Sequence, residues 1–416
     1  MDKNTSSLKQ SIARYLDARS KTQVEFLQAL VRTPSDNPPG DCHKHAEVAA
    51  ALLEDMGFVV ERHIVPETVV RHHGMRSVTN LIVRERFGPG PTVALNAHGD
   101  VVPPGEDWST DPYGGEIRNG WLYGRGAAVS KSDFATYAYA LAALRDCHAP
   151  LKGTVELHFT HDEETGGLTG PGWLLDQGLT KPDYAICAAF AYQVIIAHNG
   201  CLHLEVRLRG RSAHAAMPDT GHDAIAALMP VLQALYAHAD ELSMRPSATP
   251  GISHPTLVVG LVNGGINTNV VSDTATLRLD RRITPEEDPQ QAEQALRDLI
   301  ARAISEVKGV SQETERILLA RPLTPSAESE AFAELLCREA TAIMGESVNV
   351  HGVPLYTDAR LYSEAGIPTI MYGAGPRTLL EANGHRADER LPLDTLNKAS
   401  KVIANTLVAL LVAEKA

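Results

Sequence analysis

The 416-residue sequence lacks several features that mark whole classes of protein. No apolar run approaches the roughly 18 residues of a membrane span. The first twenty residues also lack the apolar stretch of a secretory signal. Lysine and arginine form no cluster and the net charge is -13, which argues against nucleic acid or an anionic membrane as a partner. We therefore expect a soluble, cytoplasmic protein whose partners do not include nucleic acid or a membrane.

Cysteine is also scarce. The five cysteines contain no CxxC pair, which argues against a disulfide framework or a zinc knuckle and favours reduced, mostly buried thiols. They are Cys42, Cys147, Cys187, Cys201 and Cys337. The chain shows no internal repeat and no low-complexity segment.

What the sequence does contain is enough apolar residues, 44%, for packed cores, and a length that suits two or three domains. Helical and strand patterns alternate over the first two hundred residues. Helices are predicted at 22–31 and 44–56, and strands at 58–64, 80–83, 92–97, 155–160 and 184–188. This alternation predicts an α/β fold with a mostly parallel sheet covered by helices.

From about residue 200 the order changes to strand, helix, strand, strand, helix, strand. The predicted elements are 202–209, 223–239, 256–262, 274–283, 289–307 and 313–319. This is the ferredoxin-like order. We therefore expect one domain formed by 1–199 and 316–416, with a ferredoxin-like α+β domain inserted at 200–315.

Two polar motifs follow apolar strands of the first domain, where ligands of such sheets bind. Asp100, two residues after His98, can accept a hydrogen bond from the imidazole and fix its tautomer. The adjacent Glu163 and Glu164 would raise each other's pKa in a pocket, so that one of them could act as a general base. A third candidate, His385, is a lone histidine in a polar loop and by itself indicates little.

Taken in order, the segments LNAHGDVVP, YGRGAAVSKS, HFTHDEETGG, DYAICAAFAY and EANGHRADER resemble the metallo-aminoacylase and carboxypeptidase G family, which includes acetylornithine deacetylase and succinyl-diaminopimelate desuccinylase. The resemblance runs from about residue 24 to 394. It implies a catalytic domain, an inserted dimerisation or lid domain, and two zinc ions that share a bridging aspartate. His98 would bind the first ion and Glu164 and His385 the second. Asp100 would orient His98, and Glu163 would be the base.

The sequence departs from this pattern at two metal ligands. The bridging aspartate falls on Val129 and the last ligand on Ala189, and neither side chain can coordinate a metal. Two neighbouring cations need a shared anion, and a catalytic zinc usually needs three protein ligands. We therefore expect no intact dinuclear zinc centre. The remaining candidates, His98, Glu164 and His385, would hold a single divalent metal (Zn or Mn) or none.

Three residues near the lost ligands leave alternatives open. Lys131 and Asp133 suit an ordinary helix start, but either could partly replace the missing charge. Cys187 could be a soft ligand or a nucleophile, although a thiol that ends a buried strand more often belongs to the core.

The inserted domain carries the substrate-side residues that the resemblance implies. GRSAHAAMP resembles the loop that brings a histidine from the partner subunit, so His214 would stabilise an oxyanion. Asn269 and Arg282 match positions that bind a substrate carboxylate, although a turn asparagine and a surface arginine are the plainer interpretations. Gly375 would present backbone near the substrate. Helices 223–239 and 289–307 would cover one sheet face and leave strand edges for a homodimer.

The leading interpretation is a hydrolase that acts on an amide-type C-N bond of a small carboxylated substrate, such as an acylamino acid. In this reaction Glu163 would activate water. An alternative keeps the pocket without a metal and uses His98, Asp100 and the glutamates for elimination, isomerisation or hydrolysis of an activated bond. A catalytically silent protein that binds a small molecule is the third interpretation.

Overall fold

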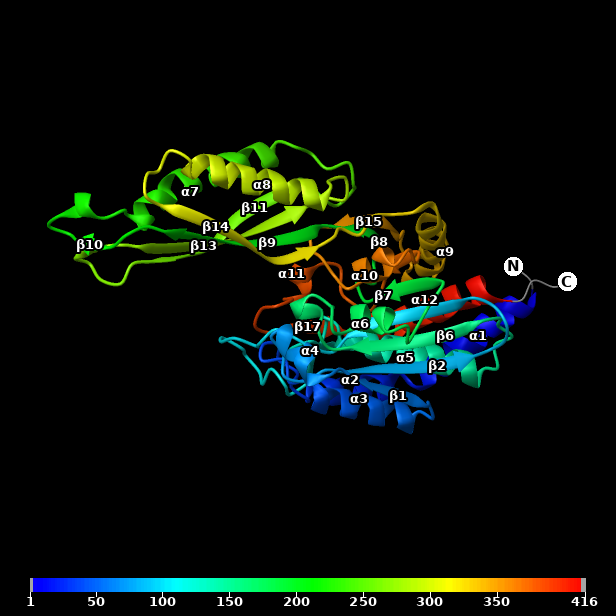
Figure 1. Cartoon of the computed structure of the whole chain (residues 1–416). Helices are drawn as coiled ribbons and strands as arrows, with labels where there is room; N and C mark the ends of the chain where they lie inside the picture. Colours follow the sequence, from blue (N-terminus) through cyan, green and yellow to red (C-terminus); the bar gives the residue numbers. More distant parts are fainter. Residues whose placement is uncertain (1–2, 413–416) are drawn as a thin grey trace. The chain divides into compact units, whose positions relative to one another are not determined.

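The computed structural model describes residues 3–412, which form two compact units (Figure 1). Unit 1 contains the described residues up to Ile196, then Pro325–His351 and the described residues from Thr357 onward. Unit 2 contains Ala197–Thr324 and Gly352–Tyr356. It therefore begins three residues before the inserted domain proposed at 200–315 and extends nine residues beyond it.

Unit 1 is built on an eight-stranded sheet in the order β1-β2-β6-β3-β7-β16-β8-β15. The four central strands, β6, β3, β7 and β16, are parallel, whereas β1, β2 and β8 pair antiparallel with their neighbours. The strands are β1 Val60–Ile64, β2 Thr79–Arg86, β3 Thr92–His98, β6 Thr154–Thr160, β7 Tyr184–Cys187, β8 Gln193–His198, β15 Asn349–Val353 and β16 Thr369–Met371. The α/β class with a mostly parallel sheet is confirmed.

Helices cover this sheet. The long ones are α1 Lys3–Ala18, α2 Ser20–Val31, α3 His43–Asp55, α5 Lys131–Asp146, α9 Ala327–Met344 and α12 Leu393–Leu411. The short ones are α4 Glu67–His72, η1 Glu163–Thr165, α6 Pro171–Asp176, α10 Ala359–Glu364 and α11 Leu379–Ala382. A small sheet in the order β17-β5-β4 joins Arg390–Pro392, Trp121–Tyr123 and Glu116–Arg118.

The alanine-rich helix α5 lies at the centre of unit 1. It contacts α1, α2 and α12 as well as β3 and β6. Because both sides are covered, it is buried along residues 131–144. Phe134 of α5 stacks on Phe159 of β6 with ring centroids 3.9 Å apart. This packing holds the start of α5 firmly against the strands whose ends carry the polar motifs.

Unit 2 has the predicted ferredoxin-like order, with a four-stranded antiparallel sheet β11-β13-β9-β14. Helices α7 and α8 cover one face of this sheet (Figure 1). The elements are β9 Gly200–Arg209, α7 Ala224–Ser243, β11 Thr256–Gly264, β13 Thr274–Ile283, α8 Pro289–Ile304 and β14 Ser311–Ala320. A separate two-stranded ribbon joins β10 Ala213–His214 to β12 Val270–Val271, and η2 Pro218–Thr220 lies between β10 and α7.

Local chemistry sets where the helices of unit 2 begin. Asp223 accepts hydrogen bonds from the backbone N–H groups of Ile225 and Ala226, and Asp288 accepts one from Gln291. These N-caps satisfy amides that would otherwise lack partners. Over residues 3–412, no helix is both long enough and apolar enough to cross a membrane.

Candidate active site

The site begins at the carboxyl end of β3. This strand lies between the parallel strands β6 and β7, so its last residue, His98, reaches the edge where three strands end. His98 is largely buried. Its Nδ1 lies 3.0 Å from the backbone O of Asp100 and 3.4 Å from the Oδ1 of the same residue. Asp100 therefore orients the imidazole through its backbone and its side chain.

The buried carboxylate of Asp100 also fixes the short helix η1. Its oxygens accept hydrogen bonds from the backbone N–H groups of Glu163 at 3.2 Å and Glu164 at 3.1 Å. A third hydrogen bond, from Asn37 Nδ2, is 2.9 Å long. An anion at the amino end of a helical turn is favourable because the first N–H groups have no partner within the helix.

Four of the predicted residues come together at this edge. His98 Nε2 lies 4.0 Å from Glu163 Oε2. One ligand atom each from His98, Glu163 and Glu164 lie within 4.8 Å of one another. His385 Nε2 lies 3.3 Å from Glu164 Oε1, with half of the His385 side chain exposed. Glu164 is therefore the residue that both histidines approach.

Burial and neighbouring charge shift the pKa values of these groups. Burial, reinforced by the Glu164 and Asp100 carboxylates, raises the pKa of Glu163 to about 8 despite the opposing effect of His98. Burial alone would lower the pKa of His98, but Glu163 and Asp100 outweigh it and hold that pKa well above its usual value. The hydrogen bond from Glu164 raises the pKa of His385. Proton-exchanging groups near neutral pH are typical of acid-base sites.

Two further buried carboxyl groups lie nearby, and the sequence analysis missed both. Burial, together with the charge of Asp100, raises the pKa of Asp162 to about 7. Burial and the charge of Asp162 raise the pKa of Asp358 well above its usual value. Each has one oxygen without a hydrogen-bond partner among the described residues. The position of Asp162 directly before Glu163 was an available signal, whereas nothing local in the sequence marks Asp358.

These carboxyl groups approach the backbone closely. A Cβ on Gly170 would overlap Asp162 Oδ1, and one on Gly167 would overlap Asp358 Oδ1. Gly167 also has a φ of +75°, which side chains rarely adopt. The glycine-containing turn after Glu164 is therefore needed to hold the acidic groups together.

The two positions without a ligand side chain border the same edge. Asn96 of β3 pairs with Cys187 of β7, and His98 and Ala189 each follow two residues later. Val129 lies in the loop before α5, and its backbone N–H donates to the buried Glu389. The next residue, Ser130, bonds through its Oγ to the backbone N of His98 at 3.2 Å. Valine and alanine thus stand beside His98 and supply no ligand atom.

The three alternative residues nearby have other surroundings. Lys131 Nζ donates to the backbone oxygens of Leu30 and Thr33, at 3.2 and 3.0 Å. Asp133 accepts from the backbone N of Ala374 at 2.7 Å, and burial raises its pKa to about 8. Burial raises the pKa of Cys187 well above its usual value, as for a core thiol. The ammonium of Lys131 is therefore engaged by carbonyl groups.

Gly375 pairs with the chain around Ala189. Its N–H donates to the Ala189 oxygen at 3.0 Å, and its own oxygen accepts from Ala191 at 2.8 Å. Both polar backbone atoms of Gly375 are thus already hydrogen-bonded within unit 1.

The remaining predicted residues belong to unit 2 and are described within it. His214 is exposed on β10, and its Nδ1 accepts from the backbone N of Ala216 at 3.1 Å. Asn269, also exposed, accepts at its backbone oxygen from Ala215 at 3.0 Å. Arg282 donates to Asp280 at 2.9 and 3.2 Å. His214 and Asn269 therefore lie on neighbouring segments of one exposed ribbon, whereas Arg282 is paired on the main sheet.

The α/β unit, its inserted ferredoxin-like unit and the histidine-carboxylate cluster together define a class of hydrolase with a separate lid or dimerisation domain. The chain belongs to peptidase family M20/M25/M40, whose family model matches residues 94–409. The sequence resemblance to metallo-aminoacylases is thereby confirmed. Family membership and the relatives described next make the protein an enzyme of the amidohydrolase or deacylase type.

Relatives cover nearly the whole chain. Succinyl-diaminopimelate desuccinylase of Sphingopyxis alaskensis is 30% identical over 405 residues, which is 94% of this chain and 98% of the relative. Acetylornithine deacetylase of Myxococcus xanthus is 27% identical over 87% of this chain and 90% of its own. The crystal structure of an M20 family metallo-carboxypeptidase from Sulfolobus solfataricus matches with a TM-score of 0.75 at 18% identity, covering 93% of this chain and 98% of that one. The structural likeness supports the fold.

Proposed function

We propose that the protein hydrolyses an amide-type C-N bond in a small carboxylated substrate, such as an acylamino acid. The observation that carries this proposal is Glu163, a carboxylate held beside His98 at the carboxyl ends of two adjacent parallel strands. The names of the desuccinylase and deacetylase relatives support an acylated substrate. We expect the protein to act on the same kind of bond.

The residues at this edge do not fit two metal ions. The bridging position is Val129 and the last ligand position is Ala189, so two cations would have no shared carboxylate. A single divalent cation, zinc or manganese, fits the donors better. His98 and Glu164 approach each other closely, and His385 lies beside Glu164. Within residues 3–412, Glu164 Oε1 is also buried without a well-formed hydrogen bond. When bound, such an ion would polarise the substrate carbonyl and lower the pKa of water.

The roles of the protein's own groups follow from their positions. Glu163 takes a proton from the attacking water and returns it to the departing amine, a task that suits a carboxyl group with a pKa of about 8. Asp100 keeps His98 in one tautomer and orientation. We further propose that His214 donates a hydrogen bond to the oxyanion, that Asn269 and Arg282 bind the substrate carboxylate, and that Gly375 borders the substrate.

A second candidate function is acid-base catalysis without a metal. Valine and alanine at two ligand positions favour it, as do buried carboxyl groups such as Glu163 and Asp162 that exchange protons near neutral pH. Elimination, isomerisation or hydrolysis of an activated bond would then use His98, Asp100 and Glu163. Full turnover after removal of all metal by a chelator would select this candidate over the first.

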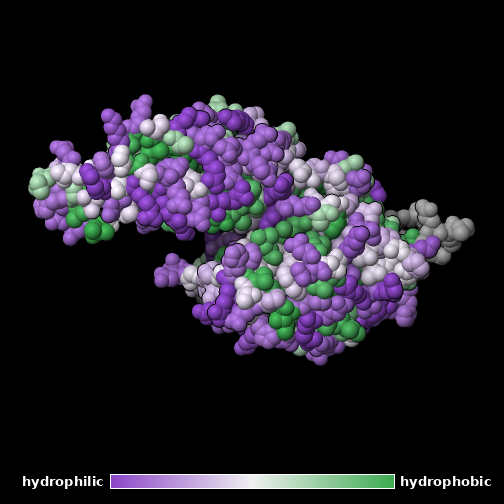
Figure 2. Space-filling model, in the orientation of Figure 1, coloured by the Kyte–Doolittle hydropathy of each residue, from purple (hydrophilic) through white to green (hydrophobic). Residues whose placement is uncertain are grey.

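We also propose a homodimer formed through unit 2. Strand β11 is an edge of the sheet, and it exposes Val258, Leu261 and Val262 with 52 to 56% of each residue accessible. The neighbouring helix α7 exposes Met229 at 64% and Tyr236 at 54%. Figure 2 shows hydrophobic surface over α7. An apolar edge strand beside an apolar helix is typical of a surface that pairs with a second copy.

The test of the proposed function is a turnover assay on a panel of acylated amino acids that measures the amine released. Glu163→Gln keeps size and most hydrogen bonds but removes the proton acceptor, so turnover should fall by roughly a hundredfold or more, as for other positioned bases. Calorimetric substrate binding should change little. The matched control is Glu67→Gln on the exposed side of α4, which should leave turnover unchanged. Near-normal turnover of Glu163→Gln would refute the proposed mechanism.

A further inference from the structure

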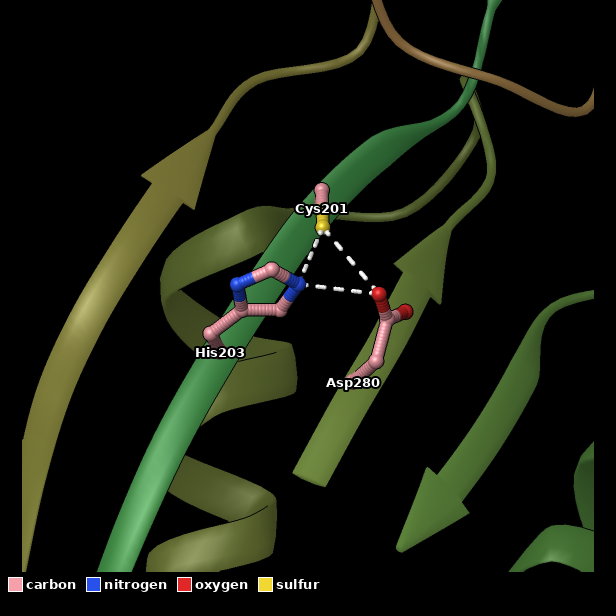
Figure 3. Close-up of side chains that lie close together, drawn as sticks. All are labelled: Cys201, His203 and Asp280. Carbon is pink, nitrogen blue, oxygen red and sulfur yellow. Dashed lines mark hydrogen bonds and ion pairs between the residues drawn. The ribbon is translucent and has the colours of Figure 1, made fainter. Parts of the chain in front are cut away.

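Three side chains with metal-binding atoms meet on the sheet of unit 2, away from the residues of the candidate active site. They come from two neighbouring antiparallel strands, β9 and β13, in which His203 pairs with Asp280 and Cys201 pairs with Arg282. Side chains alternate along a strand. Leu202 and Leu204 pack in the core with the helices, so Cys201 and His203 point to the opposite face. Figure 3 shows Cys201, His203 and Asp280 directed toward one another.

The three atoms form a compact triangle. Cys201 Sγ lies 3.2 Å from His203 Nε2 and 3.7 Å from Asp280 Oδ2, and the His203 Nε2 to Asp280 Oδ2 distance is 2.9 Å. A Cys-His-Asp proton relay would use both ring nitrogens of the histidine, one toward the thiol and the other toward the carboxylate. Here the same nitrogen, Nε2, meets both partners. The arrangement is therefore that of ligands converging on one point and not that of a nucleophile with its base.

We propose that Cys201, His203 and Asp280 form a second metal site, which binds a zinc-like divalent cation. With bonds of about 2.3 Å to sulfur and about 2.0 to 2.2 Å to nitrogen and oxygen, ligand atoms at tetrahedral angles lie about 3.4 to 3.6 Å apart. Each edge of the triangle is within about 0.5 Å of this range. The ion can thus be accommodated by small rotations of the side chains, without movement of the strands.

The surroundings of Asp280 suit this role. Arg282 Nε donates to Asp280 Oδ1 at 2.9 Å, while Arg282 Nη2 reaches Oδ2 at 3.2 Å. The first bond can persist when Oδ2 turns to a cation, and hydrogen bonds to the outer oxygen of a ligating carboxylate are common around metals. A thiolate and a carboxylate supply two negative charges, which offset those of the ion. The guanidinium of Arg282 also lies 5.6 Å from the Tyr356 ring centre, so it retains a favourable contact.

The site is accessible and separate from the first. The side chains of His203 and Asp280 are 35% and 31% exposed, which leaves a path for the ion and a fourth position for water. All three ligands belong to unit 2, whereas His98, Glu164 and His385 belong to unit 1. An ion here would join β9 to β13 and stabilise the sheet of unit 2.

Cobalt titration tests the proposal, because only this site offers sulfur. The full-length protein is stripped with a chelator and titrated with Co²⁺, and thiolate-to-cobalt charge-transfer absorption is followed in the near ultraviolet. We expect a band that saturates near one equivalent and that added Zn²⁺ removes. Cys201→Ser should abolish the band. Asp280→Asn, which keeps the size of the side chain, should weaken cobalt binding by about tenfold or more.

Two control variants distinguish this site from cobalt bound at another thiol or at the candidate active site. Cys337→Ser changes another partly buried thiol, and Glu164→Gln changes the first site; the band should persist in both. Circular dichroism and urea midpoints verify the fold of each variant. A wild-type protein without the band at stoichiometric cobalt would overturn the proposal even if no variant folds. A band that remains in folded Cys201→Ser would overturn it as well.

Discussion

The Asp100 carboxylate accepts a hydrogen bond from the backbone N–H of Glu163 at 3.2 Å, while the same residue contacts the His98 imidazole. One buried side chain therefore positions both the proposed base and the histidine. Asp100→Ala should lower turnover by about 10- to 100-fold, as expected for the loss of a group that orients a ligand, and should change substrate affinity less. Steady-state kinetics of a folded variant measure the two effects separately. Unchanged turnover would show that neither residue needs this support.

The metal content follows from the residues at the candidate active site. We predict fewer than two equivalents of transition metal bound to the His98, Glu164 and His385 cluster, because Val129 and Ala189 supply no ligand atom. If one ion is bound there, Glu164→Ala and His385→Ala should each release it. Elemental analysis of protein with the Cys201→Ser substitution, purified without chelators, reports this cluster alone. Two tightly held ions per chain would contradict the prediction.

Restoring the lost carboxylates gives a complementary test. The double substitution Val129→Asp and Ala189→Asp places anions at the bridging and terminal positions beside His98, so two ions gain a shared ligand. We expect metal content at this cluster to rise by one equivalent relative to its parent. Val129→Asn with Ala189→Asn is the matched control, since it adds similar volume without charge. Equal metal content in the two double variants would mean that the missing charge does not limit binding.

His214 lies exposed on β10, and in the proposed homodimer it would serve the active site of the partner. His214→Ala and Glu163→Gln should each be inactive alone. Mixing them should restore partial activity, because some hybrid dimers contain one site with both residues intact. Subunit exchange must be verified with differently tagged chains. No recovery after verified exchange would place His214 outside the neighbouring site, and a strict monomer in light scattering would remove the dimer itself.

Asp133 makes stability depend on pH. Its pKa is about 8 in the folded protein because of burial, whereas an unfolded aspartate titrates near 3.9. Between these values the folded state holds the extra proton, so stability falls as pH rises. Asp133→Asn removes this loss. The free energy of unfolding of the variant relative to wild type should therefore increase from pH 4.5 to pH 8, by on the order of a few kcal/mol.

Urea denaturation at both pH values measures this difference in chelator-treated protein. The exposed Asp219→Asn is the control, and its effect should be the same at both pH values. A relative stability of Asp133→Asn that does not change with pH would show that the buried carboxyl group is ionised in the fold.

Much of the fold could be predicted from local periodicity. The strand predicted at 274–283 is observed as β13 with the same bounds, and the ferredoxin-like order of unit 2 is as predicted. Helix α1 was not predicted. Its Ile12 and Leu16 are one helical turn apart and buried, and α1 contacts α5 and α12. Two apolar positions in a polar segment are a weak signal until those distant helices provide a surface.

The candidate site divides in the same way. Motif order and strand ends were enough to select His98, Asp100, Glu163 and Glu164, because parallel strands bring their carboxyl ends to one edge. The same order revealed the loss of ligands at Val129 and Ala189. Only the tertiary structure showed that Asp358 joins the acidic cluster, since that contact spans almost two hundred residues.

The Cys201, His203 and Asp280 cluster depends on tertiary structure entirely. Nothing in the local sequence relates Cys201 to Asp280, 79 residues later. The antiparallel register of β9 and β13 decides that they meet, because a shift of one residue would turn either set of side chains to the other face. Sequence periodicity thus determined which segments are strands and which face is apolar. Register, which depends on packing between distant segments, decided which polar atoms converge.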